Sequence, residues 1–231
     1  MLVGGLRALL LQTLHPATMA GVAQHSAYRE DPWGRFRRTS AFVGITTFGS
    51  EAAADKAIRQ VRHVHERVVG IDSNGQPYRA NDPHLLAWVH ATEIDSFLRA
   101  HLRYGDPLAI ADQDRYVDEM AELARRLGVI NPPTSRSELR EYLFGMRPEL
   151  EVTPETREAV RFLLAPPVPL AQRAVYAVLA GGAVELLPGF VRRMLWLPLP
   201  PGFALAARPA TASVLAGLQW LLDSPGRAPV S

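Results

Sequence analysis

"DPHLLAWVHATEIDSFLRAHLRYG", residues 82–105, carries signals for both the start and the end of one long helix. Asp82 can cap the helix, Pro83 suits its first position, and Gly105 follows its last turn. Between these signals, apolar residues recur at the three- and four-residue spacing that gives a helix one apolar face. We therefore predict a core-facing helix over 83–104.

A second helix is predicted from "SEAAADKAIRQVRHVHERVVG", residues 50–70. Ser50 can cap its start, Glu51 suits the positive end of the helix dipole, and Gly70 lies just past its end. We predict that this helix covers 51–69. The loop that follows, 72–82, is rich in turn-forming residues and could form a tight hairpin.

The rest of the chain also favours helices, and no run of alternating strands is found. Further helices are predicted at 2–14, 17–28, 112–127, 135–145, 153–164, 169–186 and 211–223. A turn is predicted at 29–34. Between the last two helices, "LPLPPGF" and "ARPA" should form an ordered loop, because proline lacks the amide donor that a helix interior needs. The predicted fold class is an all-α, single-domain helical bundle over residues 1–231.

Composition excludes several classes of protein. The chain has 231 residues, a formal net charge of +2 and no cysteine. The charge is too small and too scattered for a nucleic-acid groove, and without cysteine any metal must be held by His, carboxylates or Met. The apolar amino-terminal segment is interrupted by Arg7, so we predict a core helix there and a cytoplasmic protein. No apolar run is long enough to span a membrane, and no firm membrane anchor is expected.

Helical phase separates the histidines of the 51–69 helix. Ala54, Ile58, Val61 and His65 follow a single apolar stripe, so His65 is predicted to face the core. His63 is rotated from it by about 200° and should be solvated. His90 lies on the apolar stripe of the 83–104 helix in the same way. A buried imidazole needs either a metal or a hydrogen-bond partner, and both alternatives stay open for His65 and His90.

An arginine cluster precedes the predicted 51–69 helix. Arg35, Arg37, Arg38 and Thr39 lie within five positions, directly before an apolar run. Guanidinium groups donate in a planar fork that suits carboxylates, so the cluster could hold haem propionates or polarise dioxygen. The alternative is a solvated arginine-rich turn.

Several blocks of the sequence, in the same order, resemble the rubber oxygenase (latex-clearing protein) and MpaB-type oxygenase family. The resemblance covers about residues 6–196, and a segment before the first block could be missing. The blocks are "LLLQTLHPATMAGVAQHS", "DPWGRFRRT", "FG", "VHERVVG", "YRANDPHLLAWVHATEIDSF", "YGDPLA" and "LLPGFVRR".

The resemblance implies a globin-like helical core that holds haem b, with His65 as the proximal ligand of the iron. On the distal side it implies Arg35, Arg38 and Thr39 as catalytic residues, with Arg35 and Thr39 also contacting the cofactor. Arg38 stands where rubber oxygenases have lysine, and a guanidinium cannot deprotonate to bind iron. His90 is the second cofactor-binding candidate, either beside the haem or as the ligand itself.

The function expected from this resemblance is a haem-dependent oxygenase that uses dioxygen on an apolar, unsaturated small molecule or lipid. Rubber itself is a poor candidate substrate. Two alternatives remain: a non-catalytic protein that binds haem or an apolar ligand, and a structural relative that has lost its cofactor. The sequence does not predict the oligomeric state.

Overall fold

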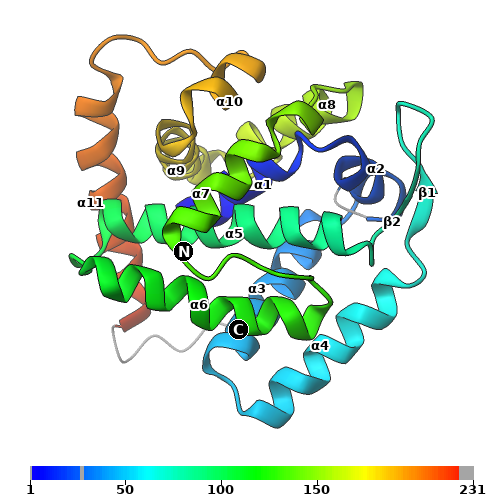
Figure 1. Ribbon diagram of the computed structural model, residues 1–231. Helices are drawn as coiled ribbons and strands as arrows, with labels where there is room; N and C mark the ends of the chain where they lie inside the picture. The colour runs from blue at the N-terminus through cyan, green and yellow to red at the C-terminus, as the bar shows by residue number, and fades with distance from the viewer. Residues whose placement is uncertain (1, 27–28, 224–231) are drawn as a thin grey trace, which may run out of the picture.

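Helix α5 (Pro83–Tyr104) crosses the middle of the protein, with other helices above and below it in this view (Figure 1). Its start and end are those predicted: the Asp82 side chain accepts a hydrogen bond from the His84 amide, and the Gly105 amide donates to the His101 carbonyl. The computed structural model describes residues 2–26 and 29–223. Within them the fold is all-α apart from one short hairpin, which confirms the predicted fold class.

Short connections join the helices and strands along the chain. The remaining α-helices are α1 (Leu2–Gln12), α2 (Pro16–His25), α3 (Pro32–Phe48), α4 (Glu51–His65), α6 (Ile110–Leu127), α7 (Arg136–Gly145), α8 (Pro154–Leu164), α9 (Leu170–Leu186), α10 (Gly189–Met194) and α11 (Phe203–Asp223). A 3-10 turn, η1 (Arg147–Glu149), follows α7, and strands β1 (Val69–Ile71) and β2 (Pro77–Arg79) pair in antiparallel fashion. None of the helices within the described residues is both long and apolar enough to cross a membrane.

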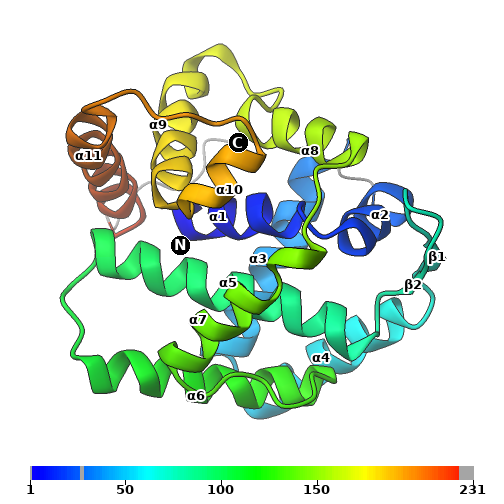
Figure 2. The same cartoon turned by 45° about the horizontal axis from the view of Figure 1, so that its top comes forward.

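The main core forms where α1 lies between α5 and α9 (Figure 2). Its buried residues come from five helices and the segments beside them, so it joins distant parts of the chain. They are Leu10, Leu11, Leu14, Trp88, Met146, Leu150, Val160, Val184, Leu187, Val191 and Leu195. Burying this much aliphatic and aromatic surface is the main favourable contribution to folding.

Arg7 enters this core as a charged side chain with no exposed surface. Its guanidinium donates to Asp95 Oδ2 at 2.7 Å, to Ser96 Oγ at 2.6 Å and to the Leu186 carbonyl at 2.9 Å. Burial lowers the pKa of Arg7, while the Asp95 carboxylate opposes that shift. One residue of α1 therefore hydrogen-bonds to both α5 and α9, and the amino-terminal segment is a core helix, as predicted.

Several predicted segments differ from the structure. Helix α4 ends at His65 rather than 69, because Val69–Ile71 pairs with Pro77–Arg79 in the hairpin that was one of two possibilities for the loop. The predicted turn at 29–34 contains the start of α3, which Asp31 caps by accepting from the Gly34 amide. Helix α3 is largely exposed, so it lacks the apolar stripe that would have revealed it.

The prediction that "ARPA" cannot be helical is wrong, because α11 begins at Phe203 and contains Pro209. Proline removes one amide donor, which leaves the Leu205 carbonyl without its helical partner. Leu205 is 81% exposed, so water can bond that carbonyl. Thr211, two residues after Pro209, is buried and donates to the Val178 carbonyl of α9, which fixes the helix on the core.

Replacing Arg7 tests the buried ion pair. Arg7→Met should lower the free energy of unfolding by about 3–5 kcal/mol, because Asp95 would lose its buried partner. The double variant Arg7→Met/Asp95→Leu should recover most of this loss, since it leaves no unpaired charge. Chemical denaturation measures both. Arg99→Ala is the control: Arg99 also pairs with Asp95, but half of its side chain is exposed, and its loss should be small. A double variant as unstable as Arg7→Met would contradict this account.

Candidate functional site

Helices α3 and α4 form a helical hairpin that brings the predicted haem-binding residues to one end. Only Gly49 and Ser50 separate the two helices, which pack together and spread apart away from this connection (Figure 1). At 1.5 Å per residue, Arg35 on α3 and His65 on α4 both lie about 20 Å along their helices from the connection. The predicted distal and proximal residues therefore occupy the same end of the hairpin.

The three distal candidates differ in how they are held. Arg35 is half-buried and donates to the Ser26 hydroxyl. Arg38 is 65% exposed and pairs with the exposed Asp31 at 3.4 Å, and Thr39 is also exposed. Among the described residues, no hydrogen bond, ion pair or ring contact joins Arg38 or Thr39 to His65. Of the three residues, Arg35 is the one that is partly buried.

The two histidines of α4 lie as helical phase predicted. His63 is exposed, and its Nδ1 lies 3.6 Å from the Glu66 carboxylate. His65 is half-buried, and burial lowers the pKa of its imidazole, which is therefore neutral at pH 7. Neutral imidazole is the form that binds a metal. Within residues 2–26 and 29–223, no hydrogen bond engages the His65 ring.

Helix α5 carries two titratable side chains, His90 and Glu93, whose pKa values are shifted by burial. Burial lowers the pKa of His90 to about 4 and raises the pKa of Glu93 to about 7. The Glu93 carboxylate also helps to raise the pKa of Tyr116 on α6, whose main cause is burial. No hydrogen bond of the His90 ring is found in the described part of the chain.

A surface groove of about 400 Å³ lies between α4 and α6, on the side of His63 rather than His65. Its lining is mostly charged and includes Asp55, Arg59, Arg62 and Arg126. The Arg126 guanidinium bonds to the Asp55 carboxylate, and Arg62 donates to the Arg126 carbonyl. An apolar cofactor or substrate bound there would remove the charged side chains of the walls from water and would gain few apolar contacts in return. This groove is therefore not the predicted haem site.

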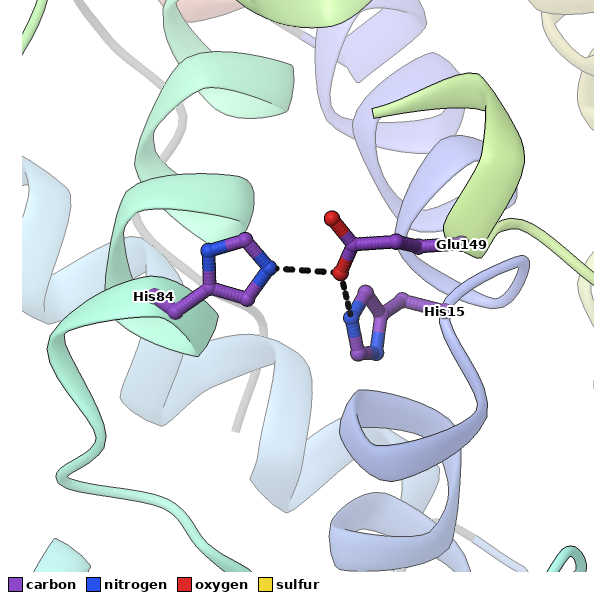
Figure 3. A group of neighbouring side chains, drawn as sticks. All are labelled: His15, His84 and Glu149. Carbon is purple, nitrogen blue, oxygen red and sulfur yellow. Dashed lines mark hydrogen bonds and ion pairs between the residues drawn. The ribbon is translucent and has the colours of Figure 1, made fainter. Parts of the chain in front are cut away.

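A separate cluster of ligating side chains was missed by sequence reasoning. His15, His84 and Glu149 point toward one another from three different segments (Figure 3). Their positions are far apart in the sequence and follow no metal-binding spacing. The only local signals were His15 directly before Pro16 and His84 directly after an Asp-Pro helix start, and neither predicts a ligand.

Comparison with known proteins adds one result. Over residues 1–219 the sequence matches the family model described as ER-bound oxygenase mpaB/B'/Rubber oxygenase, catalytic domain. No curated protein and no solved structure matches the chain. The match includes every residue of the α3–α4 hairpin and of α5.

Glu93→Gln tests the buried carboxyl group on α5. Because the pKa of Glu93 is raised above its usual value of 4.5, the wild type loses stability as pH rises from about 4.5 to 7. The glutamine variant has no such loss. Its advantage in free energy of unfolding should be near zero at pH 4.5 and grow to at most about 3 kcal/mol at pH 8.

His90 contributes equally to both proteins and cancels in this difference. Glu119→Gln, on the exposed face of α6, is the control for exchanging a carboxyl group for an amide. Urea denaturation at both pH values gives the comparison. A Glu93→Gln advantage that does not change with pH would contradict the raised pKa.

Proposed function

The chain belongs to the mpaB/rubber oxygenase catalytic-domain family, and from this membership we propose that it is a haem-b-dependent oxygenase. Its proposed substrate is an apolar, unsaturated small molecule or lipid. The family consists of oxygenase catalytic domains. Membership therefore implies that dioxygen is used as a substrate, and it suggests a metal cofactor. The observation that carries the proposal further is the position of His65, a neutral imidazole at the open end of the α3–α4 hairpin.

The residues of the hairpin fit a haem group on chemical grounds. His65 presents a neutral ring without a competing hydrogen bond among the described residues, which suits an axial ligand of iron. At the same end of the hairpin, helix α3 also leaves part of a large apolar side chain unburied: Phe36, next to Arg35, is 46% exposed. An apolar group bound against this hairpin would remove such surface from water. When bound, haem supplies an iron that can bind and activate dioxygen.

Arg35 is proposed to orient the polar parts of this site. Its guanidinium stays protonated at any physiological pH and donates in a fixed plane, so it can hold a carboxylate of the cofactor or polarise dioxygen. Thr39 lies one turn further along α3, on the same face, and can donate through its hydroxyl. Arg38 cannot replace a lysine as an iron ligand, because its guanidinium does not deprotonate.

The second candidate function is haem or apolar-ligand binding without turnover. Two observations favour it: Arg38 pairs with Asp31 on the surface, and Thr39 is exposed. In that case the protein would bind the cofactor through His65 but would lack the distal groups needed for catalysis. Oxygen consumption separates the two functions.

The first test is the absorption spectrum of protein expressed with a haem precursor. Wild type should show a Soret band, and His65→Ala should lose or shift it, because the iron would lose its axial nitrogen. His63→Ala, two residues away on the exposed side of α4, should match wild type. If His90→Ala abolishes the band while His65→Ala retains it, His90 is the ligand instead. A wild type without haem would overturn the proposal.

The second test is oxygen uptake with squalene, an unsaturated hydrocarbon, in the presence of a reductant. Wild type should consume oxygen with squalene and not with squalane, its saturated counterpart. Arg35→Leu should reduce the rate by about 100-fold, the usual effect of removing one positioned donor to developing charge. Arg37→Leu, an exposed neighbour on α3, should leave the rate unchanged. Haem binding without uptake of oxygen would favour the non-catalytic function.

A further inference from the structure

His15 is held rigidly at the junction of α1 and α2. The Thr13 carbonyl just before it accepts from Thr156 Oγ1 at 2.7 Å, and the Leu14 carbonyl accepts from the Glu151 amide at 2.8 Å. The side chain of His15 is only 9% exposed. Both of its ring nitrogens are buried and lack a hydrogen-bond partner among the described residues. Such a group costs about 1–3 kcal/mol unless something satisfies it.

His84 and Glu149 approach this ring from two other segments. His84 lies in the first turn of α5, where its amide donates to the Asp82 cap at 2.9 Å. Glu149 ends η1, and its amide donates to the Met146 carbonyl at 3.0 Å. Leu150, the next residue, is buried in the main core. The backbones that carry all three side chains are therefore fixed before any ligand binds.

The three donor atoms lie within 4.8 Å of one another, and the Nε2 atoms of His15 and His84 both face the same oxygen of Glu149, which is hydrogen-bonded to His84 (Figure 3). Glu149 Oε2 lies 2.6 Å from His84 Nε2 and 3.6 Å from His15 Nε2. The longer distance is too great for a hydrogen bond. In a tetrahedral site with bonds of 2.0–2.2 Å, donor atoms lie about 3.3 Å apart, which falls between the two measured distances. We propose that His15, His84 and Glu149 form a binding site for one divalent transition-metal ion.

The chemistry of the donors selects this class of metal. Two imidazoles and one carboxylate are the set found in catalytic zinc sites and in non-haem iron sites. Calcium and magnesium prefer oxygen ligands and are disfavoured by two imidazoles. Burial lowers the pKa of His15 despite the opposing charge of Glu149, so the ring is neutral and can donate its lone pair.

The surroundings also favour a cation that keeps open coordination positions. Asp72, in the turn between β1 and β2, adds a second negative charge that acts on His15. The side chains of His84 and Glu149 are about half exposed, at 47% and 46%, so water can reach the remaining positions. This cluster shares no residue with α3 or α4, and its test does not depend on the proposed haem.

The test is metal binding by the full-length protein after treatment with EDTA, which does not extract haem iron. Titration with Zn²⁺ against a chromophoric chelator should show one site per chain. His84→Ala and Glu149→Gln should each weaken binding at least 30-fold. Both residues are half exposed, so these variants should fold as the wild type does. Zn²⁺ should raise the melting temperature of wild type and of neither variant, because it binds only the folded site.

His63→Ala provides the matched control, because His63 also lies beside a carboxylate, that of Glu66, and no third ligating side chain joins this pair among the described residues. It should bind Zn²⁺ as wild type does. Titration with Co²⁺ should give the visible absorption bands of a four- or five-coordinate site in wild type and lose them in His84→Ala. The proposal is overturned if wild type binds no Zn²⁺, or if His84→Ala and Glu149→Gln bind it as tightly as wild type.

Discussion

The buried ion pair between Arg7 and Asp95 constrains the rest of the fold. A guanidinium without solvent contact is stable only where every strong donor finds an acceptor, and here the acceptors come from α5 and from the carboxyl end of α9. This requirement fixes how far α1 can slide along α5. The apolar contacts of Leu10, Leu14 and Trp88 then follow, since they belong to helices whose relative position is already set.

The half of the molecule built on α1, α5 and α9 and the half that contains α3 and α4 differ in how much apolar surface they bury. Helices α1, α5 and α9 share a core of fully buried side chains, whereas α3 contributes no buried hydrophobic side chain among those described. Apart from their mutual contact, α3 and α4 have few neighbours. An element with little buried apolar surface can adjust at low cost, which would suit the cofactor and substrate proposed for this hairpin.

The sequence predicted the fold where its signals are local and failed where they are not. Caps at Ser50 and Asp82 marked helix starts correctly, because a capping side chain bonds to amides within its own turn. The end of α4 depended on pairing with residues eight positions further on. Helical phase separated His65 from His63, but no local pattern could assemble His15, His84 and Glu149, which only tertiary packing brings together.

Helix α5 carries parts of both proposed sites, and its anchoring decides whether they can influence each other. His84 lies in its first turn, His90 and Glu93 in its middle, and Asp95 is fixed to α1 just beyond them. Since Asp95 prevents α5 from shifting along its axis, a metal bound at His84 can further stabilise only the segments that bring the other ligands, namely the 13–15 junction and η1. Those segments contact α8 and the main core. Metal binding should therefore stabilise the rigid half of the protein and leave the energetics of the α3–α4 hairpin nearly independent.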